Sequence, residues 1–160
     1  MMIDRAFFAA PMSGELLAMA RSIMASRPRD FRVGPDADPY MERWWLKRSP
    51  ESSIYLHRFL RSDDDRALHD HPWDSLSIVL EGRYVEVTPG GSILRIAGDI
   101  IARAATDPHR IEIAGGETAI TLFITKERIR EWGFLCPQGW RHWREFTTPG
   151  DIGGIGRGCE

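Results

Sequence analysis

The triplet His69-Asp70-His71 and the more distant His109 are the residues of this sequence best suited to carry chemistry. Side chains two residues apart on a β-strand point to the same face, so His69 and His71 on a strand can contact one ion together. His109 follows His71 by 38 residues and offers a third imidazole. Neutral imidazole is a good ligand for iron, zinc, nickel and copper. These three histidines therefore predict a site for one divalent transition metal ion, without distinguishing among these metals.

Three imidazoles on one side of a metal ion leave its other coordination positions open, which is typical of catalytic rather than structural sites. Because these ligands are neutral, the charge of a divalent ion is not compensated, and the centre should favour a small anionic substrate such as a thiolate, carboxylate or enolate. Iron(II) would suit oxygen chemistry there, whereas zinc would favour hydrolysis. The alternative is a metal-free protein in which the histidines only make local hydrogen bonds.

Strand alternation predicts which side chains surround the histidines. Ser75 and Ser77 share the parity of the triplet, and Ile111 lies two residues after His109, so these three are predicted to line a substrate pocket. Tyr55 and His57 are predicted to point inward from the preceding strand and are the candidate catalytic residues. His57 would act as an acid or base, or as a fourth metal ligand. Its competing interpretation is a buried histidine with satisfied hydrogen bonds.

Other charged groups are interpreted as solvated. The segment Ser62–Arg66 contains three aspartates and is predicted to be an exposed turn, although its charges could bind a metal. A second group could bind a substrate carboxylate if any member faced the cavity, but most of them are expected to point outward. Its members are Arg58, Arg83, Arg95 and Arg103.

A helix must precede the strands that carry these residues. Its apolar stripe comprises Leu16, Leu17, Ala20, Ile23 and Met24. The helix is predicted at about residues 13–27, with Ser13 as its N-cap and Pro28 ending it. The following segment Arg29–Pro39 is rich in Pro, Gly and Asp and is predicted to be a connecting loop.

After this loop, short segments with a period of two alternate with turn signals such as Pro89-Gly90-Gly91 and Gly115-Gly116. The predicted strands are Ile54–Leu60, Ser75–Leu80, Tyr84–Thr88, Ser92–Ile96, Ile100–Arg103, His109–Ile113 and Ala119–Thr125. Short strands with this spacing are typical of an all-β sandwich or barrel. No segment of helical length separates them, so a parallel sheet with crossover helices is not expected.

The C-terminal part contains Trp132, Trp140 and Trp143 within Trp132–Phe146, which is predicted to form one more hairpin over the barrel. The glycine-rich residues 147–160 are expected to be loosely held. The two cysteines, Cys136 and Cys159, are too few for a disulfide framework, so they are expected to be reduced. Cys136 is interpreted as a small buried residue.

Composition narrows the class of protein. The chain has 160 residues, of which 42% are hydrophobic and 28% charged, which suits one globular domain. The net charge of −2 gives no basic surface, so nucleic acid is not an expected partner. No apolar run approaches the length of a membrane span, and no secretory signal is evident, so we expect a cytoplasmic protein that does not bind membranes.

Two histidine motifs together resemble the cupin superfamily. The matching residues are His69, His71 and Gly82 in the first motif, and Gly98, Asp99 and His109 in the second. The resemblance covers about Ile54–Thr125. It departs from the usual pattern at Ser75, which stands where cupins have a metal-binding glutamate. Asp74 next to it should point to the other face.

This resemblance implies an all-β, double-stranded β-helix (a cupin jelly-roll barrel) with a short N-terminal helix. It suggests a single domain over residues 1–160, with the barrel at about 44–146. Sites with three histidines are similar to those of thiol and β-diketone dioxygenases, so a mononuclear oxygenase is the leading expectation, with iron favoured over zinc, nickel, manganese or copper. The alternatives are a non-catalytic sensor or storage protein and a metal-free sugar epimerase or isomerase. The resemblance also implies a homodimer.

Overall fold

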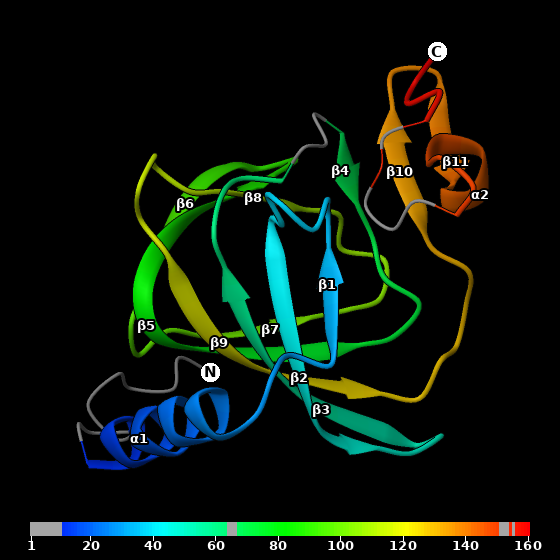
Figure 1. Ribbon diagram of the computed structural model, residues 1–160. Helices are drawn as coiled ribbons and strands as arrows, with labels where there is room; N and C mark the ends of the chain where they lie inside the picture. Colours follow the sequence, from blue (N-terminus) through cyan, green and yellow to red (C-terminus); the bar gives the residue numbers. More distant parts are fainter. Residues whose placement is uncertain (1–10, 64–66, 151–153, 155) are drawn as a thin grey trace.

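Antiparallel strands dominate the computed structural model, which describes residues 11–63, 67–150, 154 and 156–160. Its elements are α1 (Pro11–Ser26), β1 (Phe31–Val33), β2 (Met41–Arg48), β3 (Ser52–Phe59), β4 (Leu68–His69), β5 (Ser75–Thr88), β6 (Gly91–Ile96), β7 (Ile100–Arg103), β8 (Arg110–Glu112), β9 (Ala119–Lys126), β10 (Gly133–Cys136), β11 (Gly139–His142) and α2 (Trp143–Phe146). The larger sheet has the order β1-β2-β3-β9-β5-β6, and β7 and β8 also pair with β5. A smaller sheet has the order β11-β10-β4. Figure 1 shows the larger sheet curling around itself, with β10, β11 and α2 gathered at one end beside β4. The predicted all-β, curled antiparallel architecture is confirmed.

The long strand β5 produces much of this curvature. Two strands were predicted here, but the structure forms one 14-residue strand, Ser75–Thr88, that continues through a register shift between Val79 and Glu81. Gly82 is required just after the shift, because its φ is +76° and a Cβ atom would lie 2.0 Å from the carbonyl oxygen of Thr118. Before the register shift the odd-numbered residues of β5 point to the interior, and beyond it the even-numbered residues do. Glu86 is therefore buried.

Two strands at the start of the barrel were not predicted. β1 lies inside Arg29–Pro39, so the prediction of a continuous loop there is wrong. β2 escaped prediction because both of its faces are covered: Met41 packs inside the barrel, while Trp44 packs on the outer face. A strand buried on both faces loses the alternation by which a half-exposed strand is predicted.

The helix α1 covers that outer face, as Figure 1 shows. Its predicted apolar stripe is confirmed, because all five residues pack in one cluster with Trp44, Leu56, Leu80, Ile120 and Leu122. The predicted start is wrong: the helix begins at Pro11, so Ser13 lies within its first turn instead of capping it. The histidine site lies on the other, inner side of the sheet.

The C-terminal segment, meaning the described residues from Trp132 onward, forms the predicted hairpin as β10 and β11. It continues into the short helix α2. A cluster of Phe134, Cys136 and Phe146 forms its own small core, with Trp132 and Trp143 packed against it. This core is separate from the clusters inside the barrel and under α1.

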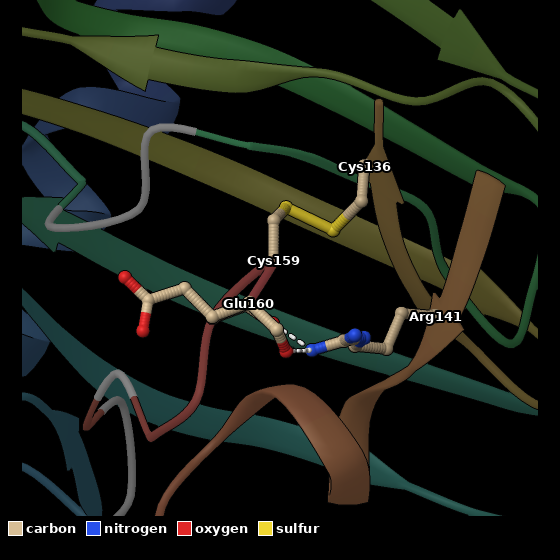
Figure 2. The surroundings of a disulfide bond; sticks show 5 residues. Cys136, Arg141, Cys159 and Glu160 are labelled. Carbon is tan, nitrogen blue, oxygen red and sulfur yellow. Dashed lines mark hydrogen bonds between the residues drawn. A yellow bond between two sulfur atoms is a disulfide. The ribbon is translucent and has the colours of Figure 1, made fainter. Parts of the chain in front are cut away.

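A disulfide joins Cys136 to Cys159, so the expectation of reduced cysteines is wrong (Figure 2). The end of the chain is also held by backbone bonds: Gly156 and Gly158 both donate to the carbonyl of Phe146. Arg141 donates to the carbonyl oxygens of Gly158 and Glu160. The expectation of a loosely held tail is therefore wrong for the described residues 154 and 156–160. Counting cysteines missed the bond because the pairing depends on how this segment folds back.

The disulfide also weakens the argument for a cytoplasmic location, because disulfides persist mainly in oxidising compartments. Among the described residues, no helix is long and apolar enough to cross a membrane.

Candidate metal centre

The imidazoles of His69, His71 and His109 converge on one point inside the barrel. Their ligand nitrogens all lie within 4.8 Å of one another, and the Nε2 atoms of His71 and His109 are 3.0 Å apart. The ring centroids are 5.0 to 5.2 Å apart. Three residues separated by up to 40 positions in the sequence thus form one compact group of nitrogen donors.

Backbone pairing explains this convergence. His69 and His109 are directly opposite each other in an antiparallel bridge, and each amide donates to the other carbonyl at 2.9 Å. Paired residues of this kind project their side chains to the same face. His71 lies two residues beyond His69 and therefore shares that face, with its amide bonded to the carbonyl of Ala105.

Asp70, between the two histidines, points the opposite way. Its carboxylate accepts hydrogen bonds from the amide of Gly133 at 2.7 Å, from Arg130 at 2.6 Å and from the indole of Trp140 at 2.9 Å. The triplet therefore has two uses: its histidines form the site, and its aspartate fastens the C-terminal segment to the barrel.

Two carboxylates that the sequence interpretation missed lie beside the ligand rings. An oxygen of Glu86 is 3.1 Å from Nδ1 of His109, and an oxygen of Asp63 is 3.7 Å from Nδ1 of His69. Carboxylates at this position fix the ring orientation of metal-binding histidines and leave Nε2 for the ion. The interpretation of Asp63 as solvated is wrong, because its side chain is only 8% exposed; residues 64–66 of that turn lie outside the described residues. Glu86 could have been found from its position, because it is the single acidic residue within the predicted strand Tyr84–Thr88.

The three histidines are neutral near pH 7. Burial, followed by the positive charge of Arg103, lowers the pKa of His69 to about 4. Burial also lowers the pKa of His109 to about 4, although Glu86 opposes the effect, and it lowers the pKa of His71 well below its usual value. For Glu86, burial raises the pKa, but His109, Arg103 and Arg95 outweigh it and lower the pKa to about 2. An anionic Glu86 beside neutral imidazoles is the protonation pattern that metal binding requires.

This donor set fits a metal ion. Two atoms that each lie about 2.1 Å from one ion, at right angles, are about 3.0 Å apart, and this matches the Nε2–Nε2 separation of His71 and His109. Within the described parts of the chain the group contains only histidines. Asp74 takes no part, because it accepts a hydrogen bond from the amide of Ala105. The residues therefore suit an ion with three protein ligands and open positions.

A cavity of about 720 Å³ adjoins the site, and His69, His71 and Asp63 form part of its wall. This volume is in the usual range for small-molecule sites. The remaining lining is mostly aromatic or apolar: Phe31, Val33, Tyr40, Met41, Arg43, Pro72, Trp73, Trp132, Phe134, Trp143, Arg144, Thr147, Thr148, Pro149, Gly150 and Gly154. The barrel and the C-terminal segment thus contribute opposite walls of one cavity.

The other predicted site residues are buried, but they do not line this cavity. Ser75, Ser77 and Ile111 lie inside the barrel on β5 and β8, and their role as pocket residues stays a prediction. Tyr55 and His57 are also buried, outside the group of three histidines. Both contact Arg43, which does line the cavity. The sequence interpretation missed Arg43 together with β2, the strand that carries it.

Comparison with known proteins adds the fold but no close relative. No protein-family model and no curated protein sequence matches the chain. A cupin-superfamily sugar phosphate isomerase from Silicibacter pomeroyi is similar in structure, with a TM-score of 0.53 and 18% identity over 81% of this chain and 96% of that one. The polyketide cyclase RemF from Streptomyces resistomycificus has a TM-score of 0.52 and 18% identity, over 70% of this chain and 75% of that one. HppE in its iron(II) form has a TM-score of 0.51 and 19% identity, over 61% of this chain and 56% of that one.

These neighbours are proteins of different kinds, so their likeness concerns architecture alone. The curled antiparallel sheet agrees with them. The chain has the double-stranded β-helix fold of the cupin superfamily.

Proposed function

We propose that this protein binds one divalent transition metal ion through His69, His71 and His109 and acts as a mononuclear non-haem oxygenase on a small anionic molecule. The observation that carries the proposal is the convergence of three neutral imidazoles, two of which form part of the wall of a large cavity. Iron is the favoured metal, and the structural similarity to HppE, which was solved with iron(II), supports this choice.

The chain's own residues prepare the site for such chemistry. Glu86 lies within hydrogen-bond distance of Nδ1 of His109 and would orient that ring, and Asp63 lies close to the ring of His69. Both imidazoles are neutral near pH 7, so they can offer lone pairs without first losing a proton. An iron(II) ion held there would supply electrons for oxygen chemistry, whereas zinc would supply only a Lewis acid.

Metal analysis tests the proposal directly. Protein purified without a histidine tag should contain close to one equivalent of transition metal, and the variant His71→Ala should contain little. Iron-loaded protein should then consume oxygen with one of a panel of small thiols, diketones and other small acids. Equal, low metal contents in the wild type and the variant would remove the basis of the proposal.

A non-catalytic sensor or storage protein would use the same cavity. It would bind metal and ligand but consume no oxygen with any member of the panel, so the same screen separates the two functions. A metal-free sugar epimerase or isomerase would require polar groups for many hydroxyls; one structural neighbour is named as a sugar phosphate isomerase. The mainly aromatic lining favours a less polar molecule.

We also propose that the protein forms a homodimer and lies in the cytoplasm. Light scattering after size-exclusion chromatography would test the first proposal, because a monomer mass would contradict it. Free-thiol measurement in cell extracts would bear on the second, since an intact Cys136–Cys159 bond in fresh extract would argue against a reducing compartment.

A further inference from the structure

Arg43 occupies an unusual position for a charged side chain. It lies on β2 in register with Phe31 on one neighbouring strand and His57 on the other, so the three residues form a row across the sheet. Its Nε donates to Nε2 of His57 at 2.9 Å, and its guanidinium lies 4.8 Å from the ring centre of Tyr55. These contacts fix the side chain in place, and Arg43 forms part of the cavity wall.

Comparison with other arginines shows what Arg43 lacks. Arg103 and Arg95 both bind Glu86, Arg58 binds Glu42, and Arg83 binds Glu117. No described carboxylate lies within ion-pair distance of Arg43, and its two Nη groups donate to no described residue. Burial accordingly lowers the pKa of Arg43. A fixed guanidinium without a counterion is costly, and an anion entering the cavity would relieve this cost.

The rest of the cavity indicates what kind of anion fits. Trp132 and Trp143 stack at 5.8 Å with an interplanar angle of 7° and form a flat wall on the side of the C-terminal segment. Trp73 stacks beside His71, with an angle of 12° between the rings. Flat aromatic walls favour planar apolar groups. Besides Arg43, the charged residues among the described lining are Asp63, beside His69, and the exposed Arg144.

Arg43 and the metal-site histidines bound the same space from different directions. His57, which accepts from Arg43, lies 5.0 Å from Phe123 between ring centres, and Phe123 lies 6.3 Å from His71. Two aromatic rings therefore separate Arg43 from the histidine group along the barrel wall. A molecule that contacts both ends must have an acidic group separated by a ring or two from the part that faces the histidines.

We propose that the cavity takes an aromatic carboxylic acid of one or two rings, that Arg43 binds its carboxylate, and that the ring lies between the aromatic walls and faces His69 and His71. Guanidinium and carboxylate pair through two parallel hydrogen bonds, which also fixes the plane of the ligand. Tyr55 and His57 are then positioning residues, because they orient Arg43 and do not touch the ligand. The substrate class rests on the proposed function, but the binding of the acid does not.

Calorimetry with two matched probes tests the proposal. Zinc-loaded full-length protein is titrated with 2-naphthoate and with its neutral isostere 2-naphthamide, because zinc prevents turnover. We expect the acid to bind at least tenfold more tightly than the amide. Arg43→Gln should abolish this preference and retain zinc. Arg58→Gln is the matched control, because Arg58 lies on the neighbouring strand and is paired with Glu42, so it should behave as wild type.

His71→Ala separates binding by Arg43 from binding by the metal. If Arg43 holds the carboxylate, the acid should keep its preference over the amide in this variant, which fails to hold metal. A preference that disappears with the metal and survives Arg43→Gln would overturn the proposal, as would equal binding of acid and amide by the wild type. If Arg43→Gln fails to fold, Arg43→Lys and the wild-type comparison still decide, because lysine keeps the charge but loses the paired geometry. If the wild type binds no metal, the proposed function is refuted, but the comparison of acid and amide binding still tests the role of Arg43.

Discussion

The barrel and the C-terminal segment contribute to one cavity in different ways. The barrel supplies Glu86 and Arg43 from the larger sheet, and the three histidines and Asp63 from β4, its bridge to His109 and the adjoining loops. The C-terminal segment supplies Trp132, Phe134 and Trp143, and it is held by its own small core, a disulfide and the contacts of Asp70. The groups suited to chemistry thus come from the barrel, while much of the cavity wall that would select a ligand comes from the C-terminal segment.

This difference suggests that the two functions can be changed separately. Strand pairing holds the imidazoles at fixed positions, because a shift of register would move every side chain to the other face. The C-terminal segment meets the ligand-bearing chain at β10, which pairs with β4, and at Asp70. We expect the parts of the segment beyond these contacts to vary without disturbing the metal ligands. Each of the following experiments perturbs one of the two regions and asks whether the other responds.

The largest effect is expected from Glu86→Gln in the barrel. This change leaves the buried Arg103 and the half-buried Arg95 without their counterion and removes the carboxylate beside His109. We expect metal affinity to fall by about 10- to 100-fold and stability to fall by roughly 3 to 5 kcal/mol. Metal titration and chemical denaturation measure the two effects. Glu117→Gln is the control, because it removes the partner of Arg83 from a surface ion pair and should leave stability and metal affinity nearly unchanged. Unchanged metal affinity in Glu86→Gln would show that the carboxylate does not support the site.

Cys159→Ser perturbs only the C-terminal segment. The bond closes a loop over a sequence separation of 23 residues, so its loss should destabilise this segment by about 3 kcal/mol. Hydrogen exchange should become faster in β10 and β11, while metal content stays that of the wild type. Cys136→Ser should have the same effect, and the double variant should add nothing, because all three remove one bond. A loss of metal in these variants would mean that the two regions are not separable.

Acid should weaken the barrel through its histidines. The pKa of His69 and that of His109 are about 4 in the folded protein and near 6.5 when unfolded, so the unfolded chain binds more protons between these values. The metal-free protein should therefore keep its full stability above pH 6.5 and lose it as the pH falls toward 4. Each histidine accounts for at most roughly 3 kcal/mol, and the pair for less than twice that, because the two groups interact. Thermal unfolding across this range measures the decline, and His109→Ala should make it shallower. A flat profile would contradict the burial of neutral imidazoles.

The smallest effect is expected where the two regions meet. Trp140→Phe removes one of the three donors to Asp70 and keeps the ring, so the cost should be about 1 kcal/mol. Metal affinity should not change. Thermal unfolding and metal titration of this variant sharpen the comparison, since a fall in metal affinity would show that the contacts of Asp70 also hold the ligands in place.

Sequence reasoning recovered the parts of this molecule that depend on local pattern. The histidine spacing, most strands and the apolar stripe of α1 follow from periodicities of two residues or one helical turn. Glu86, Asp63 and Arg43 were missed because their roles depend on pairing between distant strands. The bulge in β5 changes which parity of that strand is buried, and β2 is covered on both faces, so neither buried charge could be placed from its neighbours in the chain. The disulfide was also missed because it depends on contacts between residues that are distant in the sequence.

Asp70 has a consequence for how the protein is made. During synthesis His69 and His71 leave the ribosome well before Arg130, Gly133 and Trp140, which are the groups that bind the aspartate between them. Until those residues arrive, a carboxylate that is buried in the finished protein has no donors, and the backbone that orients both histidines is not yet fixed. The aspartate therefore gains its partners only when the last hairpin docks, and this docking also fixes the backbone that carries His69 and His71.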